Sequence, residues 1–468
     1  MSNQAPRYAV LYKTHFWDAF ADRQFHRLLE RVGPGDVFIV VDETQRVVSG
    51  IPHGRVIRMS EETARREGYR CVPPGNVFWY NTDYQLYHFV EKYPDYDYVV
   101  TVEYDVCLNI DIELIVRTMS DERLDFVGEP IRTPASLWNW AEQARPFYSD
   151  DVTIEGRLVC FAAFSREFAY QLAAARRAHT KSIQDLEAPH LAGGVMPWPN
   201  NEAFVGAEIN RLGIRAAPLS YFGDTSSYDW APAHVEFELP NTVGSILVHP
   251  VLDGPRFFRS VKRFGWDLHD VWLPATYLGG RMDQCDPSVV VPAFLQQFLA
   301  TGDTDAIEQL RNYALNRAGA RSEEFFNIAL RKPATQSSSC TWSRHPTSLA
   351  QDASGAVDGH ATGAFGFHTN LESAPWWCVD LELECPVREI RVYNRLDRPQ
   401  RARSMIVNGS LDMRIWRTLY DHHDSAQFGG ADGNALRINF AEPVKMRFLL
   451  IHLADFEILN LDQVEVFV

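Results

Sequence analysis

The sequence lacks several features that would assign it to a specialised class of protein. It has no apolar run of about 18 residues, so no transmembrane helix is predicted. Residues 1–7 lack the charged-then-apolar order of a secretory signal, so a cytoplasmic location is expected. None of the seven cysteines lies in a CxxC pair, which argues against a zinc cluster, and an odd number of cysteines fits a reducing compartment.

Positive charge is also scarce. The chain carries 45 Lys and Arg against 61 Asp and Glu, a formal net charge of −16. Nucleic acids and anionic membranes need a basic surface, so neither is an expected partner. The 468 residues are too many for one ordinary core, and a composition of 46% hydrophobic and 23% charged residues is that of a globular protein. We therefore expect two or three domains and an enzyme.

Strand and helix patterns alternate through the first part of the chain. Short apolar or β-branched runs predict strands at residues 8–12, 36–41, 98–102, 124–128 and 158–164. Apolar residues at helical spacing lie between these runs, and Ser165 is expected to cap the helix that follows it. This alternation is typical of a mainly parallel sheet with helices on both faces, which binds its ligands at the carboxyl ends of the strands.

The pattern changes after about residue 272. Residues 287–319 predict one or two small helices, and from residue 327 onward short alternating runs predict strands separated by Gly, Asn, Asp and Pro. These strands are expected at residues 388–393, 404–407, 414–419, 447–453 and 463–468. Such spacing without helices favours a β-sandwich. We predict a first domain at residues 1–275, a helical linker at 276–324 and a β domain at 325–468.

An acidic triplet ends the most strongly β-branched strand. Glu103-Tyr104-Asp105 places two carboxylates at i and i+2, where both could hold one Mg²⁺ or Mn²⁺ that bridges the phosphates of a nucleotide. With so many acids in the chain, such triplets also arise by chance, and a solvated strand end is the alternative. The position at the end of a strand and before a helix favours the metal site.

With this triplet, residues 6–265 resemble a glycosyltransferase of the GT-A type, a Rossmann-like α/β fold. Glu103 stands where that family usually carries Asp. The resemblance implies a nucleotide-diphosphate sugar as donor and a late His that completes the metal shell, for which we predict His249. Arg256 and Lys262 are predicted to grip the diphosphate electrostatically. A strand-end His and a basic surface helix are the alternatives.

An inverting transferase needs a general base in its acceptor half. Glu202 is the preferred candidate because it follows a loop rich in Gly, Pro and Trp; Glu208 is the second candidate, and Asp224 is held in reserve. An acid at the start of a helix also stabilises the helix dipole, which is the alternative for Glu202. A retaining enzyme would not need this base, and the sequence leaves the stereochemistry open.

Nucleotide and sugar contacts are expected near the ends of the first strands. Thr14 follows the first strand and Asp42 ends the second, while Asp83 could reach the nucleotide or cap its own helix. Three tryptophans could stack on sugar rings, or belong to the core: Trp138, Trp140 and Trp198.

Four segments of the last part resemble the F5/8 type C (discoidin) domain, a jelly-roll sandwich. They are residues 327–338, 356–359, 375–381 and 461–466. Fucose-binding lectins of this fold use a His and two basic residues, and the matching positions are His368, Arg395 and Arg401, with one residue fewer between the arginines than in the lectins. The guanidinium group of an arginine can donate two parallel hydrogen bonds, which suits a pair of vicinal sugar hydroxyls.

Lectin relatives also hold a structural Ca²⁺ near the turn that Asp358 and Gly359 occupy here. The residue that matches their closing Glu is Gln463, and His360 replaces their usual Asn. Loss of a carboxylate weakens a calcium site, so Ca²⁺ binding is doubtful.

The sequence thus predicts a metal-dependent glycosyltransferase that moves a sugar from a nucleotide-diphosphate donor to a glycan acceptor, in bacterial surface polysaccharide synthesis, with a C-terminal module that binds glycan. A homo-oligomer or an association with other polysaccharide-synthesis proteins is compatible with this interpretation. Two alternatives stay open: a lectin-like protein with a degenerate transferase domain, and a β domain that serves only assembly.

Overall fold

The computed structural model describes residues 5–75, 77–131, 138–183, 198–264, 271, 277–422 and 426–468. The chain forms two compact units, residues 1–267 and 268–468. Among the described helices, none is long and apolar enough to cross a membrane.

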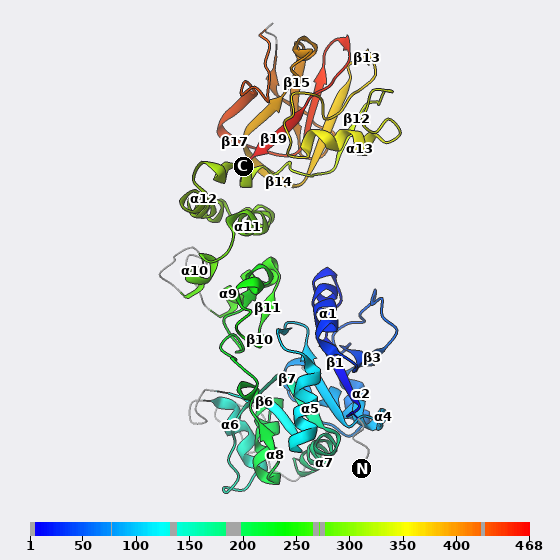
Figure 1. Ribbon diagram of the computed structural model, residues 1–468, viewed down its shortest axis with the longest axis vertical. Coiled ribbons are helices and arrows are strands. Elements are labelled where there is room, and N and C mark those ends of the chain that lie inside the picture. Colours follow the sequence, from blue (N-terminus) through cyan, green and yellow to red (C-terminus); the bar gives the residue numbers. More distant parts are fainter. Residues whose placement is uncertain are drawn as a thin grey trace. The chain divides into compact units, whose positions relative to one another are not determined.

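A seven-stranded sheet forms the centre of the first unit (Figure 1). Its strands, in spatial order, are β3 (Val56–Met59), β2 (Asp36–Asp42), β1 (Tyr8–Thr14), β4 (Tyr98–Glu103), β7 (Arg157–Ser165), β6 (Phe126–Pro130) and β8 (Ala216–Ala217). The pairs β1–β2, β1–β4, β2–β3 and β6–β8 are parallel, whereas β7 runs antiparallel to both β4 and β6. The predicted α/β sheet is therefore present, but it is mixed, because β7 reverses its direction at the centre.

Both faces of this sheet are buried. Every residue of β1 is buried, and alternate residues enter opposite cores: Leu11 lies in one apolar cluster and Val10 in the other. Helices α1 (Ala19–Val32) and α5 (Ile112–Glu122) cover one face, and α4 (Asp83–Lys92), α7 (Arg166–Ser182) and α8 (Asn201–Leu212) cover the other. A strand buried on both faces reads as a continuous apolar run, as this one does.

Local capping fixes where these helices begin. The Asp18 side chain accepts the backbone N–H groups of Phe20 and Ala21 at 3.0 Å and caps α1. Ser165 caps α7 by accepting the N–H of Phe168 at 3.1 Å, as predicted. The described part of the first unit also contains the shorter helices α2 (Glu61–Arg66), α3 (Val77–Tyr80) and α6 (Asn139–Ala144).

A late segment of the first unit returns to the end of β4. Strand β10 (Leu247–Val248) pairs with β5 (Cys107–Leu108), and β11 (Val251–Leu252) pairs with β9 (His234–Val235) before α9 (Gly254–Arg263) begins. The backbone N–H of Val251 donates to the carbonyl of Asp105 at 2.7 Å. This return places residues 245–252 beside the acidic triplet.

The second unit begins with helices and continues as β structure (Figure 1). The helices are α10 (Tyr277–Met282), α11 (Pro287–Thr301), α12 (Thr304–Ala318) and the short α13 (Leu349–Ala353). The main sheet is antiparallel, with β12 (Ala334–Gln336), β14 (Trp376–Tyr393), β17 (Leu436–Leu453), β15 (Met405–Ser410) and β16 (Arg417–Asp421) in order, and β19 (Gln463–Phe467) also paired to β14. A two-stranded sheet joins β13 (Glu372–Ser373) to β18 (Phe456–Glu457). The predicted all-β domain is confirmed.

Irregular pairing shapes the two longest strands. The register between β14 and β17 shifts between Asp380 and Cys385 and again between Val387 and Glu389. Such bulges bend a strand and increase its twist. The core beneath holds Trp377, which is fully buried and donates its indole N–H to the carbonyl of Ala353 at 2.9 Å.

Candidate functional site

A cavity of about 1110 Å³ lies in the first unit, at the edge where β1 and β4 end. Its lining includes acids, two histidines, a cysteine, arginines and several aromatic rings. The members with acidic, imidazole or thiol side chains are His15, Glu103, Asp105, Glu129, Cys160, Glu202, Asp229 and His249. The carboxyl edge of the parallel strands is where a sheet of this kind is predicted to bind its ligand.

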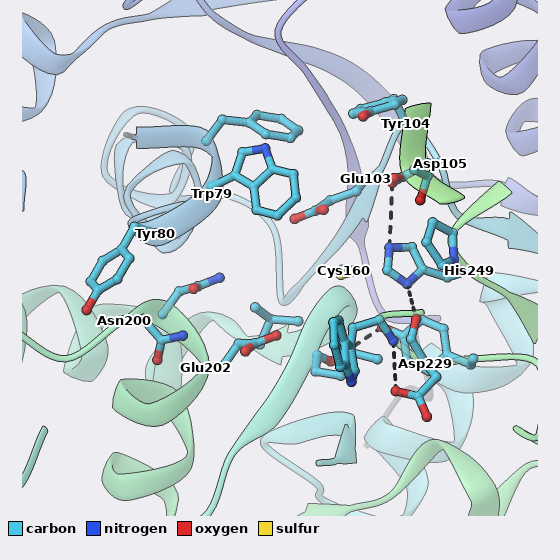
Figure 2. A pocket seen from close by; sticks show the side chains of 18 of the residues that line it. Trp79, Tyr80, Glu103, Tyr104, Asp105, Cys160, Asn200, Glu202, Asp229 and His249 are labelled. Atoms are coloured by element: carbon cyan, nitrogen blue, oxygen red, sulfur yellow. Dashed lines mark hydrogen bonds and ion pairs between the residues drawn. The ribbon is translucent and has the colours of Figure 1, made fainter. Parts of the chain in front are cut away.

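The acidic triplet lies on the wall of this cavity (Figure 2). Glu103 pairs with the buried ammonium of Lys13 at 3.2 Å, and Lys13 also donates to the Thr82 hydroxyl at 2.8 Å. The Oδ1 atom of Asp105 is buried and accepts no hydrogen bond from the described residues. Burial raises the pKa of Asp105 to about 7.

His249 joins this pair from the returning segment. Its Nδ1 lies 2.6 Å from the carbonyl oxygen of Asp229, and its Nε2 lies 3.7 Å from Oδ1 of Asp105 (Figure 2). A carbonyl can only accept a hydrogen bond, so Nδ1 carries the proton and Nε2 keeps its lone pair. Burial lowers the pKa of His249, which favours the neutral ring.

These side chains suit a divalent cation. A ligand atom each from Glu103, Cys160 and His249 lies within 4.8 Å of the others. Metal-binding histidines usually donate their second ring N–H to a carbonyl or carboxylate, as His249 does to Asp229. The unsatisfied oxygen of Asp105 points to the same need for a positive partner. Sequence reasoning missed Cys160, because its place depends on the antiparallel pairing of β7 with β4.

Glu202 reaches the cavity from the first turn of α8. Asn200 caps this helix by accepting the N–H of Ala203 at 2.9 Å. Burial, and then the negative charge of Glu103, raise the pKa of Glu202 to about 8. Such a carboxyl can exchange a proton near neutral pH, which suits a general base or acid.

The other two predicted bases do not line the cavity. Glu208 is fully buried, and Nε of Arg211 donates to both of its carboxylate oxygens at 3.0 Å. Asp224 is exposed, and its carboxylate accepts the hydroxyl of Ser226 at 2.6 Å. Glu208 belongs to an ion pair within one helix, and Asp224 forms a β-bridge with Ser245, so the structure places neither carboxylate in the cavity.

The residues predicted to contact the nucleotide are engaged in local bonds. The Thr14 hydroxyl donates to the carbonyl of Phe16 at 2.7 Å, and the Asp42 carboxylate accepts the N–H of Thr44 at 2.9 Å. Burial raises the pKa of Asp42. Both are buried at strand ends, outside the cavity lining.

Asp83 has a structural partner that the sequence did not reveal. Its carboxylate accepts Nε of Arg176 at 2.7 Å and the Tyr87 hydroxyl at 2.9 Å, inside the core. Asp83 lies outside the cavity lining, and the Thr82 side chain at the cap position makes no capping hydrogen bond. Neither predicted role, nucleotide contact or helix cap, is therefore supported.

Helix α9 presents a different set of cations from the predicted one. Arg256, Arg259 and Arg263 line the cavity, whereas Lys262 is exposed and does not. Arg256 is paired with Asp18 and Asp253, each at 2.5 Å.

Tryptophans surround the cavity, though not all those predicted. Trp138 and Trp140 line it, but Trp198 is fully buried and donates its indole N–H to Asn81 at 3.0 Å. Trp79 and Trp230, which sequence reasoning missed, line it with exposed fractions of 60% and 58%.

In the second unit, the three predicted sugar-binding residues lie close enough together for the charges of the two arginines to act on the histidine. His368 is buried, and its pKa is lowered by that burial and by the charges of Arg401 and Arg395. Arg395 forms a fork with Asp397, at 2.5 and 2.6 Å, and its guanidinium lies 5.0 Å from the ring centre of Phe365. Arg401 lies 3.9 Å from Glu457.

The turn predicted as a weak calcium site is closed by protein groups. The side-chain amide of the buried Gln463, oriented to satisfy its neighbours, donates to the Ala356 carbonyl at 3.2 Å and accepts the Gly359 N–H at 3.0 Å. Asp358 accepts the N–H of His360 at 2.8 Å. An amide in this position brings no negative charge, so the residues present fit a calcium ion poorly.

Residues 333–458 match the family model of the F5/8 type C domain. This segment is an F5/8 type C domain. Among solved structures, the chain is similar to a fucose binding module of Streptococcus pneumoniae, with 30% identity over 30% of this chain and 94% of that chain and a TM-score of 0.25. It is also similar to a fucolectin from striped bass (Morone saxatilis) serum, with 26% identity over 30% of this chain and 48% of that chain and a TM-score of 0.27. Comparison with curated proteins finds no match.

Proposed function

We propose that the chain is a metal-dependent glycosyltransferase of the GT-A type whose F5/8 type C domain binds carbohydrate. The transfer would use a nucleotide-diphosphate sugar and a glycan acceptor, as in bacterial surface polysaccharide synthesis. The observation that carries this proposal is the meeting of Glu103, Asp105 and His249 on the wall of a cavity that also holds Glu202.

The roles in the first unit follow from this geometry. Glu103, Asp105 and His249 would hold Mn²⁺ or Mg²⁺, which when bound neutralises the donor diphosphate and acts as a Lewis acid on the leaving group. Arg259 and Arg263 add positive charge to the same wall. Asp229 orients the imidazole through its carbonyl.

Glu202 is the group that would move a proton. In an inverting transfer, its carboxylate takes the proton from the acceptor hydroxyl as that oxygen attacks the sugar. Positive charge at the acidic triplet lowers the pKa of Glu202 from its raised value, so the base becomes available when the cation is in place. A retaining transfer would leave Glu202 to orient the acceptor.

Carbohydrate binding by the F5/8 type C domain rests on His368, Arg395 and Arg401. Two guanidinium groups beside a neutral imidazole offer several donors and one ring nitrogen to vicinal hydroxyls. The ring of Phe365, 5.2 Å from that of His368, adds an apolar surface for the C–H face of a sugar.

One observation favours the alternative of a non-catalytic, lectin-like protein. Glu103 already has a cationic partner in Lys13, so the site could be neutralised within the chain without binding a donor. Under this interpretation, the first unit is a degenerate transferase domain.

Turnover of nucleotide sugars separates the two candidates. The purified full-length protein is incubated with a panel of nucleotide-diphosphate sugars, with Mn²⁺ or with a chelator, and release of the nucleoside diphosphate is measured. The transferase proposal predicts cation-dependent release from at least one donor, and its loss in Asp105→Asn. Asp224→Asn, an exposed acid outside the cavity, serves as the control and should keep the activity. Inactivity with every donor would favour the lectin.

A further inference from the structure

Cys160 occupies a position that none of the roles above uses. Strand β7 pairs antiparallel with β4, and Val102 lies opposite Phe161. The next residues along the two strands, Glu103 and Cys160, are therefore neighbours at the edge of the sheet. The cysteine sulfur, a Glu103 oxygen and a His249 ring nitrogen all lie within 4.8 Å of one another (Figure 2).

The thiol has no competing partner. All seven cysteines are free, and the Cys160 thiol makes no hydrogen bond to a described residue. It is half-buried and lines the cavity, so an ion that enters the cavity can reach it. A buried cysteine often serves only as a small apolar residue. Here, however, the sulfur faces a carboxylate and an imidazole whose Nε2 has a free lone pair.

We propose that Cys160 is a ligand of the cation held by Glu103 and His249, and that its thiolate makes the site prefer Zn²⁺ or Co²⁺ over Mg²⁺. The inference rests on the metal site of the proposed function, which it extends by naming a sulfur ligand and the class of cation. Magnesium takes oxygen ligands almost exclusively, whereas thiolates are soft ligands that suit zinc.

The donor set supports this preference. Cys, His and Glu supply sulfur, nitrogen and oxygen, the three ligand types that zinc accepts in proteins. Asp105, with Oδ1 unsatisfied and 3.7 Å from Nε2 of His249, is the fourth group within reach. The ligand atoms of Glu103, Cys160 and His249 already lie within 4.8 Å of one another, so one ion can be shared among them.

Cobalt absorption tests the sulfur ligand directly. Co²⁺ is titrated into the full-length, metal-free protein, and the near-ultraviolet band that arises from charge transfer between thiolate and Co²⁺ is recorded. In the natural protein, we expect the band to grow until one Co²⁺ is bound per protein molecule. In Cys160→Ser, we expect the band to be absent. The matched control is Cys340→Ser, because Cys340 forms the other thiol–imidazole pair of the described residues, with Sγ 3.0 Å from Nδ1 of His368. The control should keep the band.

Affinities give a second measurement. Removal of an outer-sphere partner typically weakens metal binding by about 10- to 100-fold, so loss of a ligand should weaken Zn²⁺ binding by at least about tenfold. Mg²⁺ binding should change little in the same Cys160→Ser variant. If the serine variant does not fold, the absence of the band from the natural protein still overturns the inference.

The outcomes separate this inference from the proposed function. A thiolate band that persists in Cys160→Ser, or Zn²⁺ affinity that is unchanged, overturns the cysteine ligand even if the protein transfers sugar. A thiolate band lost only in Cys160→Ser establishes the ligand even if the protein is inactive with every donor, because cobalt binding is read without any donor.

Discussion

Nε2 of His249 lies 3.7 Å from Oδ1 of Asp105, in a pair formed by two distant segments of the chain whose side chains are 7% and 13% exposed. The backbone bond from Val251 to Asp105 ties those segments together, and the Asp229 carbonyl fixes the other ring nitrogen. The imidazole is thus oriented before any ligand arrives, and preorganised groups of this kind are what metal and catalytic sites require.

His249→Gln should weaken Mn²⁺ binding by about 10-fold or more, because the variant loses the oriented nitrogen. Electron paramagnetic resonance of free Mn²⁺ measures the affinity in the full-length protein. His360→Gln is the control, since this side chain is 73% exposed and lies in the second unit. Equal affinity in the natural protein and in His249→Gln would remove His249 from the metal site.

Glu202→Gln should stabilise the metal-free protein at high pH and lower its activity. The folded-state pKa of Glu202, about 8, lies above the ordinary value of 4.5, so its contribution to stability is present at low pH and is lost as pH rises through about 8. In metal-free protein, the glutamine variant should therefore be more stable than the natural protein at about pH 9, by on the order of 1–3 kcal/mol, and equally stable near about pH 4.

Loss of the base should also lower the turnover rate by about 10²–10⁴-fold in an inverting transfer. Chemical denaturation at several pH values and donor turnover give the two readings. Glu208→Gln, in the same helix, is the control for stability, because breaking its pair with Arg211 should destabilise the protein instead. A glutamine variant at position 202 that is less stable than the natural protein at high pH would contradict the assigned environment.

Asp83→Ala should destabilise the first unit by about 3–5 kcal/mol, because it leaves the guanidinium of Arg176 buried without its carboxylate. Thermal and denaturant unfolding measure the loss. At temperatures where the variant stays folded, its KM for a donor should be close to that of the natural protein. An increase in KM with unchanged stability would restore the nucleotide-binding role that the sequence allowed.

Arg395→Ala should abolish glycan binding by the F5/8 type C domain, as measured on a glycan array with the full-length protein. Arg447→Ala is a matched control: it also removes an arginine fork to an aspartate, Asp380 at 2.8 Å, but Arg447 lies within β17, whereas Arg395 follows the end of β14. Binding should persist in a chelator, because the Gln463 amide closes the turn that a calcium ion holds in the lectins. Binding retained in Arg395→Ala would favour the assembly role of the domain.

Much of the fold follows from local patterns, because each buried strand of the first unit is a continuous apolar run. The reversed direction of β7 could not be predicted this way, since an apolar run shows that a strand is buried but not which way it runs. Cys160 was missed for the same reason. The F5/8 type C segments, in contrast, are short motifs whose order in the sequence suffices, and the family match agrees with them.

In the candidate site too, local sequence patterns predict some residues, and long-range contacts determine the others. Glu103 and Asp105 could be predicted because both lie at the end of one strand. The ion pair between Asp83 and Arg176 could not, because the two residues are distant in the sequence. Of the two cations predicted on α9, Arg256 lines the cavity and Lys262 does not, and Arg259 and Arg263 line it as well. Burial, which gives Glu202 its raised pKa, is not readable from a sequence of this kind.

The central claim is that a divalent cation at the end of β4 binds the diphosphate of a nucleotide sugar. Crystals of the full-length protein, soaked with Mn²⁺ and a panel of nucleoside diphosphates, test it most directly through the anomalous signal of manganese. The account predicts a manganese peak in contact with Glu103, Asp105 and His249, and a diphosphate bound to it within the cavity. Nucleotide and manganese bound elsewhere, or neither bound while the cavity is open to solvent, would contradict it.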